Sequence, residues 1–168
     1  MTQLESFLAR FLAPATASHA RFFPRGPFIS ISLAQTIIES DWGQSPAGAN
    51  NYWGIKATPA QISTGQYRIV WTHETLNGIY QKLPQYFATY PTLEAGFDAH
   101  AHLLTTPWYQ RCMDAPTPND YAHALWLCHY ATGIPGHPYD EALINIMKTY
   151  NLYQFDRPAP VPAPGAVS

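Results

Sequence analysis

The sequence predicts a mainly helical α+β domain in which one small β-hairpin is inserted between two helical halves. Apolar residues recur at helical spacing near the N-terminus and again from residue 93 onward. Between them, residues 67–87 are rich in β-branched and aromatic side chains, and Asn77-Gly78 is a strong hairpin-turn signal. The chain has 168 residues, of which 46% are hydrophobic, so it can bury a sizeable core. We expect one folded domain over residues 1–156 and an extended, Pro/Ala-rich tail over residues 157–168.

The two N-terminal helices differ in their apolar pattern. The first is predicted as an amphipathic docking helix, because its apolar residues fall on one face: Leu4, Phe7, Leu8, Phe11 and Leu12. The second, over residues 29–42, is apolar nearly all round, which is typical of a buried central helix. Gly43 and Pro46 mark where it has ended.

Within the hairpin, Pro84 should lie near an edge or a strand end. Three further helices are expected after the hairpin. The first carries Phe97, Ala101 and Leu104 on one side. The second starts sharply, with Thr117 as cap, Pro118 at the first position and Asp120 in the first turn, and should end near Gly133. The last follows Pro138, with its apolar face made by Tyr139, Leu143, Ile146, Met147 and Tyr150.

Charge and composition argue against several classes of protein. The net charge is −2 and the basic residues form no stripe, so we expect no nucleic-acid partner. No apolar run is long enough to span a bilayer, so membrane insertion is not expected. The seven histidines show no metal-ligand spacing, and we expect neither a metal nor another cofactor. Cys112 and Cys128 are expected to be buried thiols, although a single bond between them stays open.

Glu39 is the main candidate for chemistry, since it is a carboxylate at the end of an apolar helix. Burial against its neighbours, which include Ile38 and Trp42, would raise its pKa. A carboxyl group that stays protonated near neutral pH can act as a general acid on a leaving-group oxygen. A solvated glutamate at a helix end is an equally good interpretation of periodicity alone.

The loop that follows favours the catalytic interpretation. It brings together amides and flat rings of the kind that a sugar-binding cleft needs, at Asn50, Asn51, Tyr52 and Trp53, together with Trp42. Rings can stack on pyranose faces, and amides can bond hydroxyl and N-acetyl groups. Each aromatic taken singly is more often a core residue.

Several motifs resemble the peptidoglycan-cleaving N-acetylglucosaminidases of glycoside hydrolase family 73, to which the flagellar rod-associated wall hydrolase domain also belongs. The segments "AQTIIESDWGQS" and "NNYWGIKA" resemble its signature, and "VWTHETLNG" followed by "QYFATYPTLEAGFDAHAHLL" resembles its hairpin and next helix. The segment "HYATGIPGHPYDEALINIMKTYNL" resembles its closing segment. The resemblance covers about residues 28–153 in the family's order, and it implies a lysozyme-like helical lobe with a small β-lobe.

The resemblance also implies roles for individual residues. Glu39 matches the catalytic acid, Glu74 matches a β-lobe acid proposed to activate water, and Tyr130 matches a cleft tyrosine needed for full activity. An exposed strand residue is the competing interpretation of Glu74, and the substrate's own N-acetyl group could then assist instead. Trp53 stands where the family usually has Phe, and His129 stands where it usually has Gly.

The resemblance implies cleavage of the β-1,4 bond between N-acetylglucosamine and N-acetylmuramic acid. A muramidase or lytic transglycosylase on the same fold, and a non-catalytic wall-binding domain, are the alternatives. The N-terminus does not look like a signal peptide, because Glu5 and Arg10 interrupt its apolar residues. We therefore expect either a phage endolysin or a toxin injected into the periplasm by a system such as type VI secretion. An injected toxin would need a cognate immunity protein, expected to plug the cleft.

Overall fold

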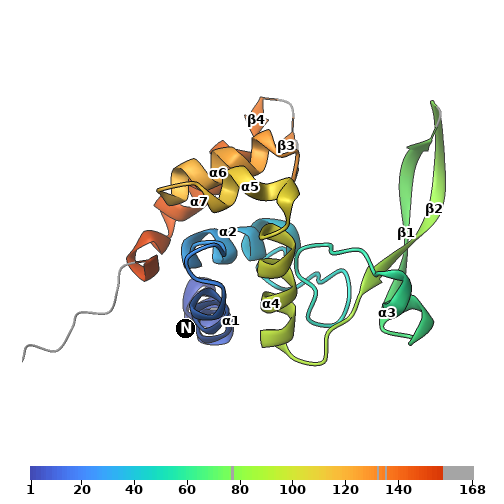
Figure 1. Ribbon diagram of the computed structural model, residues 1–168, viewed down its shortest axis with the longest axis horizontal. Helices are drawn as coiled ribbons and strands as arrows, with labels where there is room; N and C mark the ends of the chain where they lie inside the picture. The colour runs from blue at the N-terminus through green and yellow to red at the C-terminus, as the bar shows by residue number, and fades with distance from the viewer. Residues whose placement is uncertain (77, 132, 135, 157–168) are drawn as a thin grey trace, which may run out of the picture.

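The computed structural model describes residues 1–76, 78–131, 133–134 and 136–156, and their side chains except at residues 74–76 and 134. Figure 1 shows a helical lobe from which one long hairpin projects on one side. The elements before the second helical half are α1 (Gln3–Phe22), α2 (Ile29–Ser40), α3 (Pro59–Ser63), β1 (Tyr67–Leu76) and β2 (Ile79–Ala88). Those that follow are α4 (Leu93–Leu104), η1 (Pro107–Tyr109), α5 (Gln110–Met113), α6 (Pro118–Leu127), β3 (Gly133–Ile134), β4 (His137–Pro138), α7 (Tyr139–Thr149) and η2 (Leu152–Asp156). The predicted mainly helical fold with an inserted hairpin is confirmed.

Helix α2 is the centre of the core, as its pattern predicted. Ten of its twelve residues are buried, and Ile31, Leu33 and Ala34 are completely buried. It contacts α1, α6, α7 and η2. The aromatic side chains of α1 pack beside it, with the rings of Phe7 and Phe11 4.8 Å apart.

The predicted capped start of α6 is confirmed, whereas two predicted helix ends were wrong. The hydroxyl of Thr117 accepts a hydrogen bond from the amide of Asp120, and α6 begins at Pro118 as expected. That helix ends at Leu127 rather than near Gly133, because His129 turns the chain with a φ of 57°. Helix α2 ends at Ser40, so Trp42 lies in a left-handed turn after the helix and not within it.

The hairpin pairs residue by residue from Tyr67 opposite Ala88 to Leu76 opposite Ile79. Pro84 lies in the middle of β2, opposite Trp71, and a two-stranded sheet leaves each strand with an open edge that tolerates proline. Asn77 of the predicted turn lies outside the described residues. The base of the hairpin is joined to the helical lobe through Asn51, described below.

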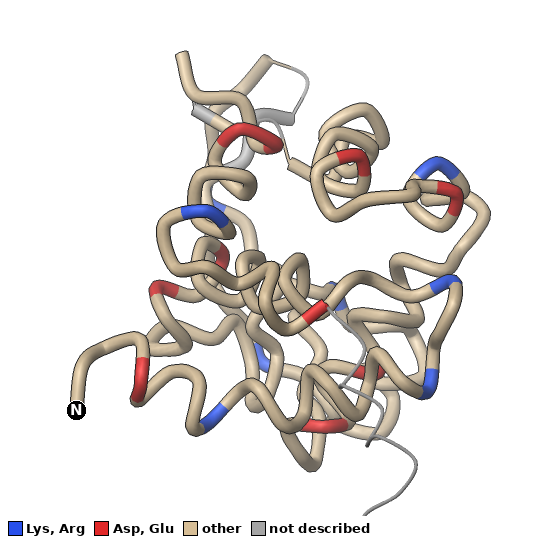
Figure 2. Tube along the Cα trace, turned by 90° about the vertical axis from the view of Figure 1, so that its left-hand side faces the viewer, with Lys and Arg blue, Asp and Glu red and all other residues tan. Residues whose placement is uncertain are grey.

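Charge and cysteine placement agree with the composition. Figure 2 shows blue and red residues scattered over the trace, with no basic stripe on the part of the chain that it describes. Cys112 and Cys128 are both buried and unbonded. Among the described residues, no helix has the length and apolar character needed to cross a membrane.

Candidate active site

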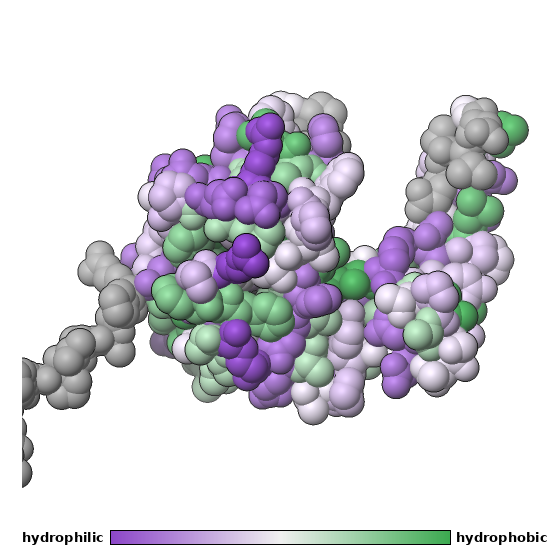
Figure 3. Space-filling view, in the orientation of Figure 1, coloured by the Kyte–Doolittle hydropathy of each residue, from purple (hydrophilic) through white to green (hydrophobic). Residues whose placement is uncertain are grey.

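Glu39 lies in the last turn of α2, one residue before the helix ends. The C-terminal end of α2 points toward the side of the helical lobe on which the hairpin stands (Figure 1). A wide hollow separates the helical lobe from the hairpin in the space-filling view (Figure 3). Glu39 is exposed as a residue, whereas the neighbouring residues Ile37 and Ser40 are buried. The helix therefore presents the carboxylate of Glu39 at its end, beside the exposed Ile38, and buries Ile37 and Ser40 on either side of this pair.

The carboxyl group of Glu39 is held by a tyrosine from the last helix. Tyr139 donates a hydrogen bond from its phenol to Oε1 of Glu39 at 2.7 Å. The side-chain amide of Gln35, one turn before Glu39 on α2, donates to the same phenol oxygen at 3.1 Å. Gln35 and Tyr139 are buried, with 0% and 3% of their surfaces exposed. This chain of hydrogen bonds connects the helix core to the carboxylate.

Tyr130 packs against this pair from the segment after α6. Its ring stacks on the ring of Tyr139, with centroids 5.7 Å apart and planes 23° apart. Its phenol oxygen is buried and has no hydrogen-bond partner among the described residues. Burial and then the nearby charge of Glu39 raise the pKa of Tyr130 well above its ordinary value. Tyr130 is thus a neutral phenol near Glu39, and the role in activity that the resemblance implied for it stays a prediction.

The surroundings of Glu39 favour its protonated form. Although the residue reaches the surface, its carboxyl end is partly buried against the two tyrosines, and this desolvation raises its pKa. The hydrogen bond from Tyr139 lowers the pKa and offsets part of the increase. A carboxyl group with a raised pKa can donate a proton near neutral pH, which is what a general acid must do.

Glu74, the predicted second acid, lies on β1 opposite Gln81, close to the hairpin turn. The distal part of the hairpin stands well apart from α2 in Figure 1. The structure therefore does not bring the backbone of Glu74 beside Glu39. Its predicted role in activating water stays a prediction.

The predicted sugar-binding loop is largely built into the core. The side chain of Asn51 is completely buried, where its amide donates to the carbonyls of Ile55 and Ala88 and its oxygen accepts from the amide of Ile55. Asn50 adopts a left-handed backbone with a φ of 54° and donates to the carbonyl of Tyr90. Both asparagines thus join the loop to the second strand and its exit.

The aromatic residues of the same loop also face inward. Tyr52 and Trp53 are 2% and 5% exposed, so neither offers a ring face to a ligand in this structure. Arg10 of α1 donates to the phenol oxygen of Tyr52. Trp53 packs edge-on against Phe97 and stacks on His100. Their predicted contact with sugars remains a prediction, and the structure gives them a packing role.

Trp42 is the predicted binding residue that does reach a surface cavity. It is half-buried and lies edge-on to Phe7 and Tyr150. The cavity beside it is lined mainly by α1, with Gln3, Ser6, Phe7, Arg10, Phe11, Trp42 and Gln44. None of the residues that line it belongs to the hydrogen-bond chain at Glu39.

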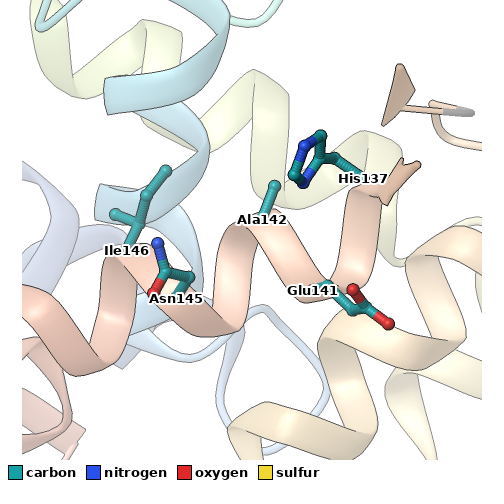
Figure 4. A pocket seen from close by; sticks show the side chains of 5 residues that line it. All are labelled: His137, Glu141, Ala142, Asn145 and Ile146. Carbon is teal, nitrogen blue, oxygen red and sulfur yellow. The ribbon is translucent and has the colours of Figure 1, made fainter. Parts of the chain in front are cut away.

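A second cavity lies along α7, the helix that begins with Tyr139. Figure 4 shows its lining, in which His137 comes from β4 and the other side chains come from α7: Glu141, Ala142, Asn145 and Ile146. His137 and Ala142 lie two residues before and three residues after Tyr139. The cavity therefore borders the segment that supplies the partner of Glu39.

Two residues of the site were missed by the sequence analysis as functional groups. Tyr139 was assigned only to the apolar face of the last helix, and Gln35 received no role. The four-residue spacing of Gln35 and Glu39 could have suggested that they share a helix face. No local pattern connects Tyr139 to Glu39, because they are 100 residues apart in the chain.

Comparison with known proteins gives a consistent result. Residues 25–152 match the family model for glucosaminidases, described as mannosyl-glycoprotein endo-beta-N-acetylglucosaminidase. The exo-glucosaminidase LytG of Bacillus subtilis is 32% identical over 139 residues, covering 78% of this chain and 47% of LytG. A probable N-acetylmuramidase of Lactococcus lactis is 33% identical over 142 residues, covering 78% of this chain and 31% of the relative. The chain thus spans less than half the length of these two relatives.

A solved structure also matches most of both chains. The C-terminally truncated glycoside hydrolase domain of Salmonella typhimurium FlgJ superposes with a TM-score of 0.68 and 28% identity, covering 89% of this chain and 98% of that domain. This agreement confirms the lysozyme-like helical lobe with a small hairpin lobe that the resemblance implied. The position of His129 fits as well, since its positive φ is a conformation that the family's usual glycine adopts without strain. With the family model matching residues 25–152, the chain belongs to the glucosaminidase family of glycoside hydrolases.

Proposed function

We propose that this chain hydrolyses peptidoglycan, cutting the β-1,4 bond between N-acetylglucosamine and N-acetylmuramic acid, with Glu39 as the general acid. The observation that carries the proposal is the Tyr139–Glu39 pair at the exposed end of α2. It provides a carboxyl group that reaches solvent, has a raised pKa and is held in one orientation. Family membership and the name of LytG support this choice of bond.

In the proposed reaction, Glu39 gives its proton to the glycosidic oxygen as the bond from that oxygen to the sugar C1 breaks. Water then adds to C1 and loses a proton. The proton goes either to Glu39, which restores the acid directly, or to Glu74, in which case proton exchange with solvent restores both carboxyl groups. The attack on C1 can take place by two routes. Glu74 could deprotonate the attacking water, or the carbonyl oxygen of the substrate's N-acetyl group could bond to C1 first and be displaced by water. The separation of Glu74 from α2 favours the second route in this structure.

The name of a different relative supports cleavage of the other glycosidic bond, the one that a muramidase cuts. The Lactococcus lactis protein is named as a probable N-acetylmuramidase, and it matches the chain about as well as LytG does. Mass spectrometry of digested sacculi distinguishes the two. New reducing ends on N-acetylglucosamine support the proposal, reducing ends on N-acetylmuramic acid indicate a muramidase, and anhydro ends indicate a lytic transglycosylase.

The acid role is tested with Glu39→Gln. The substitution keeps the shape and removes the transferable proton, so dye release from labelled sacculi should fall by about 10²–10⁴-fold. Circular dichroism checks that the variant is folded. A folded Glu39→Gln protein with near wild-type turnover would exclude this mechanism.

We further propose an immunity protein as a candidate partner and the periplasm of a target cell as the place of action. The hollow between the helical lobe and the hairpin (Figure 3), on the side toward which the C-terminal end of α2 points (Figure 1), could accept a segment of an inhibitor. A chain in the structure of a type VI secretion system effector–immunity complex from Pseudomonas protegens matches with a TM-score of 0.57 and 16% identity, which is a likeness of fold alone. Co-purification of this chain with the product of a neighbouring gene, together with inhibition of dye release, would support the partner.

A further inference from the structure

The hydrogen bonds behind Glu39 have a defined direction. A side-chain amide nitrogen only donates, so the phenol oxygen of Tyr139 accepts from Nε2 of Gln35. The single phenol hydrogen is then available for Oε1 of Glu39, at 2.7 Å. Gln35 therefore sets the direction in which Tyr139 donates.

This direction distinguishes the two oxygens of the carboxyl group. Oε1 receives a hydrogen bond from Tyr139, and an oxygen that already accepts from a phenol is a poor place for an acidic proton. Oε2 has no such donor among the hydrogen bonds seen at Glu39 in the described residues. The transferable proton is thus assigned to Oε2.

The packing holds Tyr139 in this geometry. Its ring stacks on Tyr130, and it is the first residue of α7, directly after Pro138. Behind Tyr130 lies His100 of α4, with ring centroids 6.5 Å apart. Burial lowers the pKa of His100 to about 3, so this ring is neutral and adds no charge near the acid. Within the described part of the chain, the titratable groups that interact with Glu39 are the phenols of Tyr139 and Tyr130, both neutral because burial raises their pKa values.

We propose that Tyr139, oriented by Gln35, is the positioning residue for Glu39, fixing Oε1 as an acceptor and leaving Oε2 to carry the proton that is transferred. The inference rests on the proposed role of Glu39 as acid. Tyr139 touches the acid rather than the substrate, so its loss should affect proton transfer more than substrate binding.

The first test is Tyr139→Phe, which removes the phenol oxygen and keeps the ring. A hydrogen bond to a charged group corresponds to a change of about 10- to 100-fold, so kcat should fall on that order while KM changes little. Because the lost donor favoured the ionised carboxylate, the pKa of Glu39 should rise, and the alkaline limb of kcat/KM should move to higher pH. A residue needed only for packing would not move that limb.

The matched control is Tyr121→Phe, since Tyr121 is also a buried tyrosine but its phenol oxygen has no partner among the described residues. It should leave kcat and the pH profile unchanged. Gln35→Met should weaken activity less than Tyr139→Phe, because the phenol can still donate to Glu39. Equal kcat and equal pH profiles for Tyr139→Phe and wild type would overturn the inference.

A measurement on the folded wild type keeps the test independent of how Tyr139→Phe folds. The ¹³Cζ resonance of Tyr139 should shift with pH as Glu39 titrates, and this shift should be absent in Glu39→Gln. A ¹³Cζ chemical shift of Tyr139 that does not change as Glu39 titrates would by itself overturn the inference. If Glu39→Gln is fully active, the proposed acid fails, whereas an inactive Glu39→Gln with an unaltered Tyr139→Phe refutes only the positioning role.

Discussion

The indole ring of Trp53 lies parallel to the imidazole ring of His100, with centroids 4.6 Å apart and planes 12° apart. His100 is completely buried, and both of its ring nitrogens lack a hydrogen-bond partner among the described residues. An imidazole in such a place is held by ring stacking and cannot accept a proton without large cost. The stack joins the loop after α2 to helix α4, directly behind Tyr130.

His100 should make the protein lose stability in acid. Its pKa is lowered from 6.5 to about 3 by burial. Between these two pH values the unfolded chain therefore binds a proton at His100 and the folded chain does not. The stabilisation is complete above pH 6.5 and is lost toward pH 3, at up to about 1.4 kcal/mol per pH unit. The free energy of unfolding of His100→Phe, measured with urea, should not show this loss between pH 6.5 and pH 3. His102→Phe, at an exposed position of the same helix, is the control and should keep it.

Glu39 should have the opposite dependence on pH. Its pKa is raised by desolvation, so the folded state binds the proton more tightly than the unfolded state does. Stability is then greatest below the ordinary pKa of 4.5 and falls as pH rises through the raised value. Glu39→Gln should therefore melt at a higher temperature than wild type at pH 7, with the difference vanishing in acid. An unchanged difference at the two pH values would show that Glu39 is not desolvated.

The sequence was sufficient for the parts of the fold that depend on local pattern. The capped start of α6, the apolar α2 and the pairing of β1 with β2 each follow from residues close to one another in the chain. The early end of α6 was missed because His129 adopts a left-handed conformation. A glycine at this position would have indicated such a turn in the sequence, whereas a histidine does not.

The site was predictable only in part, for a physical reason. Glu39 could be found from its place at the end of an apolar helix, but its partner Tyr139 depends on how α7 packs on α2. The loop residues Asn51, Tyr52 and Trp53 have the composition of a sugar site, and the same amides and rings can equally satisfy a buried loop. Composition alone does not distinguish these two uses, since the difference lies in contacts with distant strands and helices.

Asn51 should be critical for joining the two lobes. Asn51→Ala removes two donated bonds and one accepted bond in a completely buried place, leaving the carbonyls of Ile55 and Ala88 without these partners. We expect a loss of about 2–4 kcal/mol in the free energy of unfolding. Amide hydrogen exchange should increase at the base of the hairpin, around Ala88. The exposed Asn145→Ala serves as the control, and a similar loss there would contradict this assignment.

Gly96 should tolerate no side chain, because α4 passes directly against the loop at that point. A Cβ atom added at Gly96 would collide with the backbone oxygen of Asn50. Backbone cannot turn aside as a flexible side chain can, so Gly96→Ala should destabilise by about 1–3 kcal/mol despite the better helix propensity of alanine. Thermal unfolding measures the loss. A more stable Gly96→Ala protein would mean that α4 and the loop are not in close contact.

The effect of the chain on bacteria should depend on the compartment in which it is located. Peptidoglycan strands lie outside the cytoplasmic membrane, so bacteria that make the chain in the cytoplasm should grow normally. The same chain directed to the periplasm by an added signal peptide should weaken the wall and cause rounding and lysis. Glu39→Gln should abolish the lysis, because binding to glycan strands does not break them.

Plate viability of four strains, with two compartments and two alleles, decides between the outcomes. Equal toxicity in both compartments would indicate an intracellular target and would contradict a peptidoglycan substrate. Toxicity that is confined to the periplasm but independent of Glu39 would keep the wall as target and overturn the acid. Toxicity that requires both the periplasm and Glu39 is expected, since the raised pKa of that carboxyl group matters only where a glycosidic oxygen can receive its proton.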